Sequence, residues 1–219
     1  MTVSAHLTLP QAYALLLLRP DGKLTDAEQT FDPGVAGAVL GDLALRGLVQ
    51  FDGRKVIPVK SAPVGDPVID GMKERIDASS SPRRPATWVS RYANATVGRA
   101  VLTGLVGRGV VARQEHRVLG IFPSVRWPER DGGPAKLLRV ELSDVLHDGV
   151  APSPFAAALI GLLSATNSLR GQFGAVDRQR VKALTTGDWV ADAVKSVVQT
   201  RHTSTTIGAG AVGPMSSSS

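Results

Sequence analysis

Arginines concentrated in the middle of the chain are the residues whose type and spacing are best suited to binding a ligand. Residues 83–139 contain 11 Lys and Arg against 3 Asp and Glu, whereas the whole chain carries a net charge of +6. Guanidinium groups bind phosphate with paired hydrogen bonds, so this block favours a polyanionic partner, either a nucleic acid or an anionic membrane surface. A solvated basic face without a ligand is the plainer alternative. The candidates for binding lipid headgroups are Arg83, Arg84, Arg91, Arg99 and Arg126.

The spacing of these residues supports a single binding surface. Arg91 and Arg99 lie eight residues apart on one predicted helix, so their side chains project about 80° apart and can serve one concave patch. Arg126 is followed by Trp127 in the segment SVRWPERDGG, which we predict to be an exposed loop. Because an indole ring partitions into the headgroup region of a membrane, Trp127 is the candidate for membrane insertion. The alternative is that Trp127 folds back onto the domain, and Trp88 is expected in the core.

The remaining residues offer no chemistry for catalysis, and we predict a non-enzymatic protein with no metal site and no cofactor. The segment GAGAVG at 208–213 has the spacing of a dinucleotide-binding loop, but no predicted strand precedes it and Pro214 follows where a helix should begin. The four histidines are scattered along the chain. The absence of cysteine excludes disulfide bonds and thiolate metal sites.

The segment Asp32–Phe51, DPGVAGAVLGDLALRGLVQF, predicts the element on which the other elements pack. Asp32 is suited to cap a helix, Pro33 to occupy its first position, and Gly47 to end it. The positions between are almost all apolar, so no face suits water and the helix should be buried. It is also too short to cross a bilayer, which takes about twenty residues. Its glycines and alanines form a small-residue surface against which another helix can pack closely.

The pattern along the chain predicts a mainly α fold, a single globular helical domain around this buried central helix, with one or two short β-hairpins. We expect the domain to span residues 1–201 and the low-complexity segment 202–219 to be a disordered tail. A helix that ends in Arg-Gly and runs into a hairpin occurs twice, with Asp52-Gly53 as the first turn. Further helices are predicted at 8–18, 68–78, 87–108, 135–147, 154–169, 177–184 and 188–199, and hairpin strands at 48–51 with 55–59 and at 110–113 with 117–122.

The N-terminal segment lacks the features of a secretory signal. It has no basic region, and its apolar run ends at Arg19-Pro20. We therefore expect a cytoplasmic protein that attaches peripherally to the inner face of the membrane.

Several segments together resemble the Golgi phosphoprotein 3 family over residues 7–198. The resembling segments are LTLPQAYALLLL, LGDLALRGLVQF, SAPVGDPVIDGMKE, LVGRGVV, VLGIFP and AALIGLLSA. The resemblance implies a mostly helical domain with a short β-hairpin that binds phosphatidylinositol 4-phosphate on membranes and helps to retain glycosyltransferases, which would be a protein partner.

The family's headgroup pocket is made by a tryptophan and three arginines. In this chain the corresponding positions fall near Ala27 and on Ala36, Ala95 and Gly98. No pocket residue is therefore carried over from the family. Arg91 and Arg99 lie close to these positions, so a shifted and less selective basic pocket is the expectation for this chain.

A winged-helix-like nucleic-acid-binding protein is the alternative function. Two helix–hairpin units with arginines nearby could place a helix in a groove of DNA and a hairpin on its backbone. Against this alternative, the first of these helices is too apolar to face DNA. A scaffold that binds other proteins through its helical faces is a third hypothesis.

Overall fold

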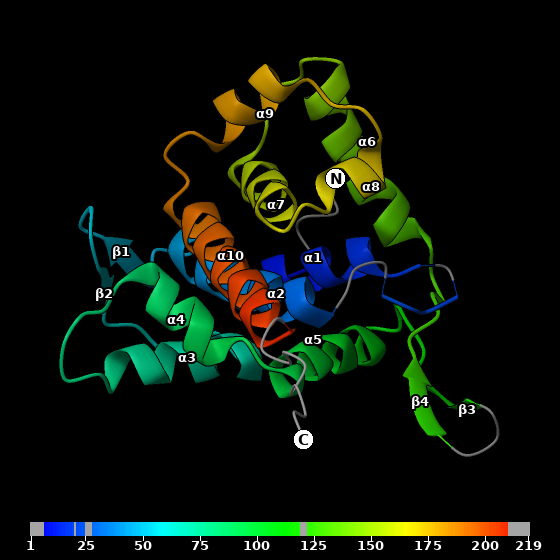
Figure 1. The fold of residues 1–219 in the computed structure, drawn as a ribbon, viewed down its shortest axis with the longest axis horizontal. Helices are drawn as coiled ribbons and strands as arrows, with labels where there is room; N and C mark the ends of the chain where they lie inside the picture. Colours follow the sequence, from blue (N-terminus) through cyan, green and yellow to red (C-terminus); the bar gives the residue numbers. More distant parts are fainter. Residues whose placement is uncertain (1–6, 20, 25–27, 119–121, 210–219) are drawn as a thin grey trace, which may run out of the picture.

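The computed structural model describes residues 7–19, 21–24, 28–118 and 122–209. This part of the chain is mainly helical and includes two separate antiparallel hairpins, as predicted (Figure 1). None of its helices is both long and apolar enough to span a membrane. The helices are α1 (Leu9–Leu17), α2 (Glu28–Leu45), α3 (Pro67–Asp77), α4 (Pro85–Tyr92), α5 (Ala95–Gly107), α6 (Gly133–His147), α7 (Pro154–Ala165), α8 (Leu169–Phe173), α9 (Arg178–Thr185) and α10 (Trp189–Ala209). The strands are β1 (Val49–Phe51), β2 (Val56–Pro58), β3 (Gln114–Val118) and β4 (Phe122–Arg126).

Helix α2 is the buried centre of the fold, which confirms the main prediction. It packs against α1, α3, α4, α5, α7 and α10, and it lies behind α10 in Figure 1. Its start differs from the prediction, because α2 begins at Glu28 and contains both Asp32 and Pro33. Thr30 and Phe31 in this first part are buried, so packing outweighs the backbone hydrogen bond that Pro33 cannot donate. At the other end, Gly47 has φ +69° and stops the helix as expected.

Glycines let the neighbouring helices approach α2 closely, as the small-residue pattern predicts. A Cβ on Gly34 would overlap the ring of Tyr13 from α1, and one on Gly37 would overlap Val194 from α10. The buried carboxylate of Asp42, 3% exposed, accepts a hydrogen bond of 2.7 Å from the backbone N–H of Leu9. Asp42 also pairs with Arg46 one turn later. The first turn of α1 is thereby attached to α2.

The predicted single helix over 87–108 is wrong, because the chain forms two helices, α4 and α5. The chain is extended at Ala93 and Asn94, and the Asn94 side chain accepts hydrogen bonds of 3.1 Å from the N–H groups of Thr96 and Val97. Such a cap starts a new helix with a new direction. Arg91 therefore lies on α4 and Arg99 on α5, so their helical spacing does not place them on one face.

The two hairpins differ in how well the sequence predicts them. The pair β1–β2 lies where it was predicted. The second hairpin begins later than predicted, with Gln114 opposite Arg126 in β3–β4, because Val111 pairs with Glu129 instead. The expected loop around Arg126 is therefore partly strand, and the hairpin projects from the helices (Figure 1).

The C-terminal helix is longer than predicted. Helix α7 ends at Ala165, the short α8 follows it, and α10 continues to Ala209. Residues 202–209 thus belong to α10, and the rest of the tail that was expected to be disordered, 210–219, lies outside the described residues.

Candidate functional site

Helix α4 positions most of the candidate arginines. It begins with Pro85 in its first turn, directly after Arg84, and it buries Trp88 and Val89 against the core. Arg91, three residues after Trp88, is exposed. Because α4 has only eight residues, arginines at both of its ends lie close to the elements on either side. One groove separates α4 from α10 and another separates it from α3.

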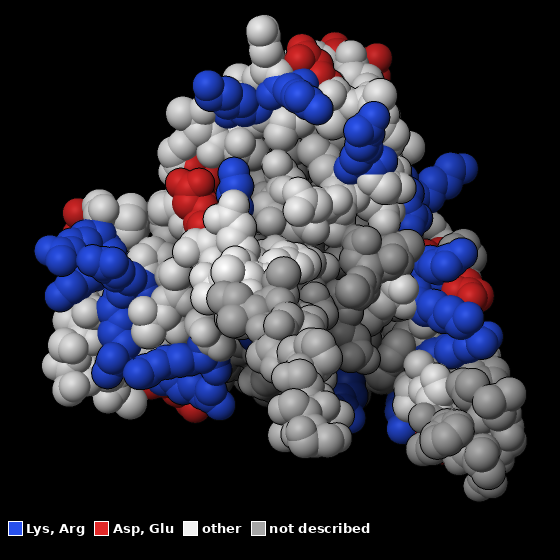
Figure 2. All heavy atoms as spheres, in the orientation of Figure 1, with Lys and Arg blue, Asp and Glu red and all other residues white. Residues whose placement is uncertain are grey.

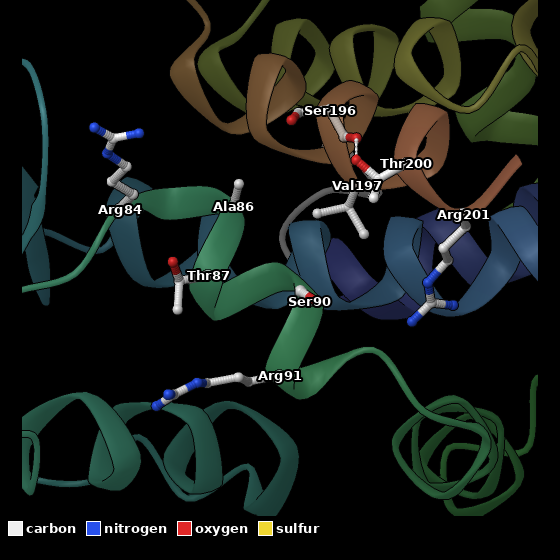
Figure 3. A pocket seen from close by; sticks show the side chains of 9 residues that line it. All are labelled: Arg84, Ala86, Thr87, Ser90, Arg91, Ser196, Val197, Thr200 and Arg201. Atoms are coloured by element: carbon white, nitrogen blue, oxygen red, sulfur yellow. Dashed lines mark hydrogen bonds between the residues drawn. The ribbon is translucent and has the colours of Figure 1, made fainter. Parts of the chain in front are cut away.

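The α4–α10 groove, with a volume of about 470 Å³, combines cations with hydroxyl groups (Figure 3). None of the described residues that line it is Asp or Glu. Arg201 of α10 donates a hydrogen bond of 3.0 Å to the carbonyl oxygen of Ala93, which attaches α10 to the end of α4. Guanidinium and hydroxyl groups are the donors that proteins use for phosphate and polyol ligands. Its polar lining residues are Arg84, Thr87, Ser90, Arg91, Ser196, Thr200 and Arg201.

The α3–α4 groove has a similar volume, also about 470 Å³. Arg83 donates a hydrogen bond of 3.2 Å from Nε to Oγ of Ser79, and the Arg75 guanidinium lies 5.0 Å from the centre of the Tyr92 ring. The Tyr92 hydroxyl donates to the carbonyl oxygen of Val68 at 2.6 Å. Burial raises the pKa of Tyr92, so this hydroxyl stays protonated at neutral pH. Arg91 lines this groove as well as the other one.

The arginines around α4 belong to a larger cationic surface. Figure 2 shows Lys and Arg gathering over the β1–β2 hairpin and over α3 and α4, with Asp and Glu visible only at the margin of this area. Interspersed carboxylates would neutralise such a surface. Asp52, Glu74 and Asp77 are also exposed on these elements, and Asp77 pairs with Lys73, so they offset part of this positive charge.

The structure brings together three of the five predicted arginines. Arg83, Arg84 and Arg91 line the two grooves, whereas Arg99 lies on α5 and lines neither of them. Arg99 is exposed and donates to the carbonyl oxygen of Ala95. Arg126 lies on the separate β3–β4 hairpin. The five residues therefore do not form one patch.

Two further arginines of the grooves, Arg75 and Arg201, are not predicted from the sequence. Arg201 falls just after the helix expected to end at residue 199, and Arg75 lies outside the most basic segment. A signal for Arg201 does exist, because it follows the buried Val194 and Val197 by seven and four residues and so continues the same face of α10.

The predicted exposure of Trp127 is wrong, and membrane insertion by this residue has no support in the structure. Its side chain is only 6% exposed. The backbone N–H of Trp127 donates to the carbonyl oxygen of Gly22 at 2.9 Å, so the turn at Asp21-Gly22 packs against it. Gly22 has φ +77°, and a Cβ there would overlap the backbone of Trp127. Trp88 is 4% exposed and lies in the core, as expected.

The fold and the grooves define the class of protein as a mainly helical domain with a cationic, hydroxyl-lined surface. The chain belongs to the Golgi phosphoprotein 3 (GPP34) family, whose family model matches residues 9–201. The resemblance seen in the sequence is thereby confirmed. A comparison with curated proteins finds no match.

Proposed function

We propose that this protein is a non-enzymatic peripheral membrane protein that binds anionic lipid headgroups at the arginines around α4. The observation that carries this proposal is the α4–α10 groove, which is lined by three arginines and four residues with hydroxyl groups, with no Asp or Glu among its described lining residues. Family membership supports a lipid-binding or adaptor role in general. Recruitment of a protein partner to the membrane is the adaptor part of the proposal.

The shape of the site favours a headgroup over a nucleic acid. Concave sites of roughly 300–1,000 Å³ suit small ligands, and both grooves are of this size. The winged-helix alternative requires an exposed helix beside a hairpin. In the first helix–hairpin unit that helix is α2, which is buried by the surrounding helices.

The same family resemblance suggests phosphatidylinositol 4-phosphate as the lipid, but the corresponding positions of this chain do not provide the donors. Ala36 is fully buried, and the space beside Gly98 is filled, since a Cβ there would lie 2.9 Å from the Phe31 ring. The proposed headgroup site is therefore next to α4 and not at the positions used by the family.

The strength of attachment follows from the number of arginines that can reach the membrane. Each Lys or Arg near an anionic leaflet contributes about 1 kcal/mol. Five arginines line the two grooves, so the expected attachment is weak, reversible and reduced by salt. Those five residues are Arg75, Arg83, Arg84, Arg91 and Arg201.

The test is co-sedimentation with phosphatidylcholine vesicles that contain an anionic phospholipid. The double variant Arg84→Ala, Arg91→Ala should bind about 30-fold more weakly than wild type, since two such contributions are lost. The double variant Arg99→Ala, Arg126→Ala removes the same charge elsewhere and should bind within about threefold of wild type. Failure of the wild-type chain to sediment at low salt refutes the proposal. An equal loss in both variants refutes the location of the site.

A further inference from the structure

Trp88 has a buried indole N–H that donates to no described atom. Its Nε1 has an accessible surface below 1 Å² and no hydrogen-bond partner. Buried tryptophan N–H groups usually find an acceptor, and one without an acceptor destabilises the fold. Trp88 lines the α3–α4 groove, where a bound acceptor would satisfy it.

The charges around Trp88 indicate which acceptor suits this groove. Three arginines, Arg75, Arg83 and Arg91, line it, and none of its described lining residues is Asp or Glu. The Tyr92 hydroxyl is already engaged with Val68. An anionic acceptor is thus the chemistry that matches the groove, and a phosphate oxygen can accept from both guanidinium and indole N–H groups.

Arg91 connects this groove to the α4–α10 groove, because it lines both. In Figure 3 its side chain extends from α4 toward α3. A guanidinium has five N–H donors and can therefore donate to two phosphates, one on each side. Two separate anions bound at one guanidinium repel each other, and each loses its own translational entropy. One molecule that carries both phosphates loses translational entropy only once, so it is favoured over two separate anions.

We propose that the two grooves bind the two phosphate groups of a single lipid, in which a short polyol joins two phosphodiesters. This inference rests on the proposed function and names the class of lipid. One phosphate binds between α4 and α10, next to Arg201 at the C-terminal end of α4. The other binds between α3 and α4, where Trp88 donates its indole N–H. Because this N–H is buried, side chains that line the groove must shift before the phosphate can reach it.

The test compares two kinds of phosphatidylcholine vesicle that carry the same number of phosphate charges. One contains diphosphatidylglycerol, and the other contains phosphatidylglycerol at twice the mole fraction. Wild-type protein should bind the diphosphatidylglycerol vesicles at least about tenfold more tightly, because the second phosphate binds as part of the same molecule. Trp88→Phe should abolish this preference, because it weakens binding to diphosphatidylglycerol vesicles more than binding to phosphatidylglycerol vesicles.

Arg83→Gln provides a second variant that does not alter the core, and it should also reduce the preference. Thermal unfolding of Trp88→Phe shows whether its fold is retained. Equal binding of wild type to both vesicles overturns the inference and leaves the proposed function standing, whereas binding to neither overturns the proposed function itself. Soluble glycerol 1,3-bisphosphate, added without vesicles, distinguishes a lipid ligand from a free bisphosphate. If this compound binds in a Trp88-dependent way and the protein shows no preference between the two kinds of vesicle, the lipid assignment is overturned.

Discussion

Substitution of Gly34 by alanine tests whether close packing on α2 sets the stability of the fold. A Cβ at this position would lie 2.6 Å from Cε1 of Tyr13 and closer still to Cζ and the hydroxyl oxygen. Tyr13 is fully buried, and its hydroxyl donates to Oγ1 of Thr166 at 3.2 Å. The ring is therefore held in place and cannot swing away from the added methyl group.

The change in the free energy of unfolding caused by Gly34→Ala is the sum of two opposing contributions. Alanine in place of glycine inside a helix stabilises by about 1 kcal/mol. Overpacking a well-filled core costs about 1–3 kcal/mol, occasionally more, and a fixed aromatic ring corresponds to the upper end. The expected net loss for Gly34→Ala is about 2 kcal/mol, which lowers Tm by about 4–8 °C in a domain of this size.

Thermal unfolding monitored by circular dichroism measures this change, with Gly107→Ala as the matched control. Gly107 is the last residue of α5, and no described atom lies within 4 Å of the position of its added Cβ. The control should have a Tm equal to that of wild type or up to about 3 °C higher, because only helix propensity acts there. A Tm of Gly34→Ala at or above that of wild type would refute the packing argument.

Three further predictions concern buried groups. Asp42→Ala leaves the buried backbone N–H of Leu9 without its acceptor, so urea denaturation should show a free energy of unfolding about 1–3 kcal/mol lower than that of wild type. Asp42→Asn keeps an acceptor oxygen and should lower the free energy of unfolding by less. Burial raises the pKa of Asp188, so the folded state favours its protonated form, and stability is lost as pH rises from the ordinary carboxyl pKa through the raised one. The Asp188 side chain caps α10 by accepting hydrogen bonds from the N–H groups of Val190 and Ala191, and Asn in its place can still accept them. The Tm of Asp188→Asn should therefore rise relative to that of wild type as pH increases from 4 to 7. A difference in Tm that does not change with pH would contradict this reasoning. In a variant whose other tryptophans are phenylalanine, the fluorescence emission of Trp127 should not change when anionic vesicles are added, because the ring is already buried. A blue shift of this emission would instead support insertion of Trp127 into the membrane.

Local signals explain which helices are predictable from the sequence. Asp66, placed before Pro67, accepts hydrogen bonds from the N–H groups of Val68 and Ile69 and starts α3 where expected. Thr8 similarly precedes α1, with Pro10 in the first turn. These ends depend on residues only a few positions apart, so the sequence is sufficient to locate them.

The features that the sequence does not predict depend on packing between distant segments. The same kind of signal, Asp32 followed by Pro33, fails at α2 because Thr30 and Phe31 of the preceding turn are buried in the core. Asn94 caps α5 within a stretch whose apolar pattern runs on, so periodicity hides the break between α4 and α5. The candidate site depends on this break, and on Arg201, more than 100 residues away along the chain from α4.

The placement of α10 has a consequence for synthesis of the protein. This helix packs on α2 in the core and also provides Ser196, Thr200 and Arg201 to one wall of the α4–α10 groove. A nascent chain whose residues 189–201 are still inside the ribosome has neither that wall nor the complete interior. If lipid binds at this groove as proposed, binding there should begin only after translation has passed α10.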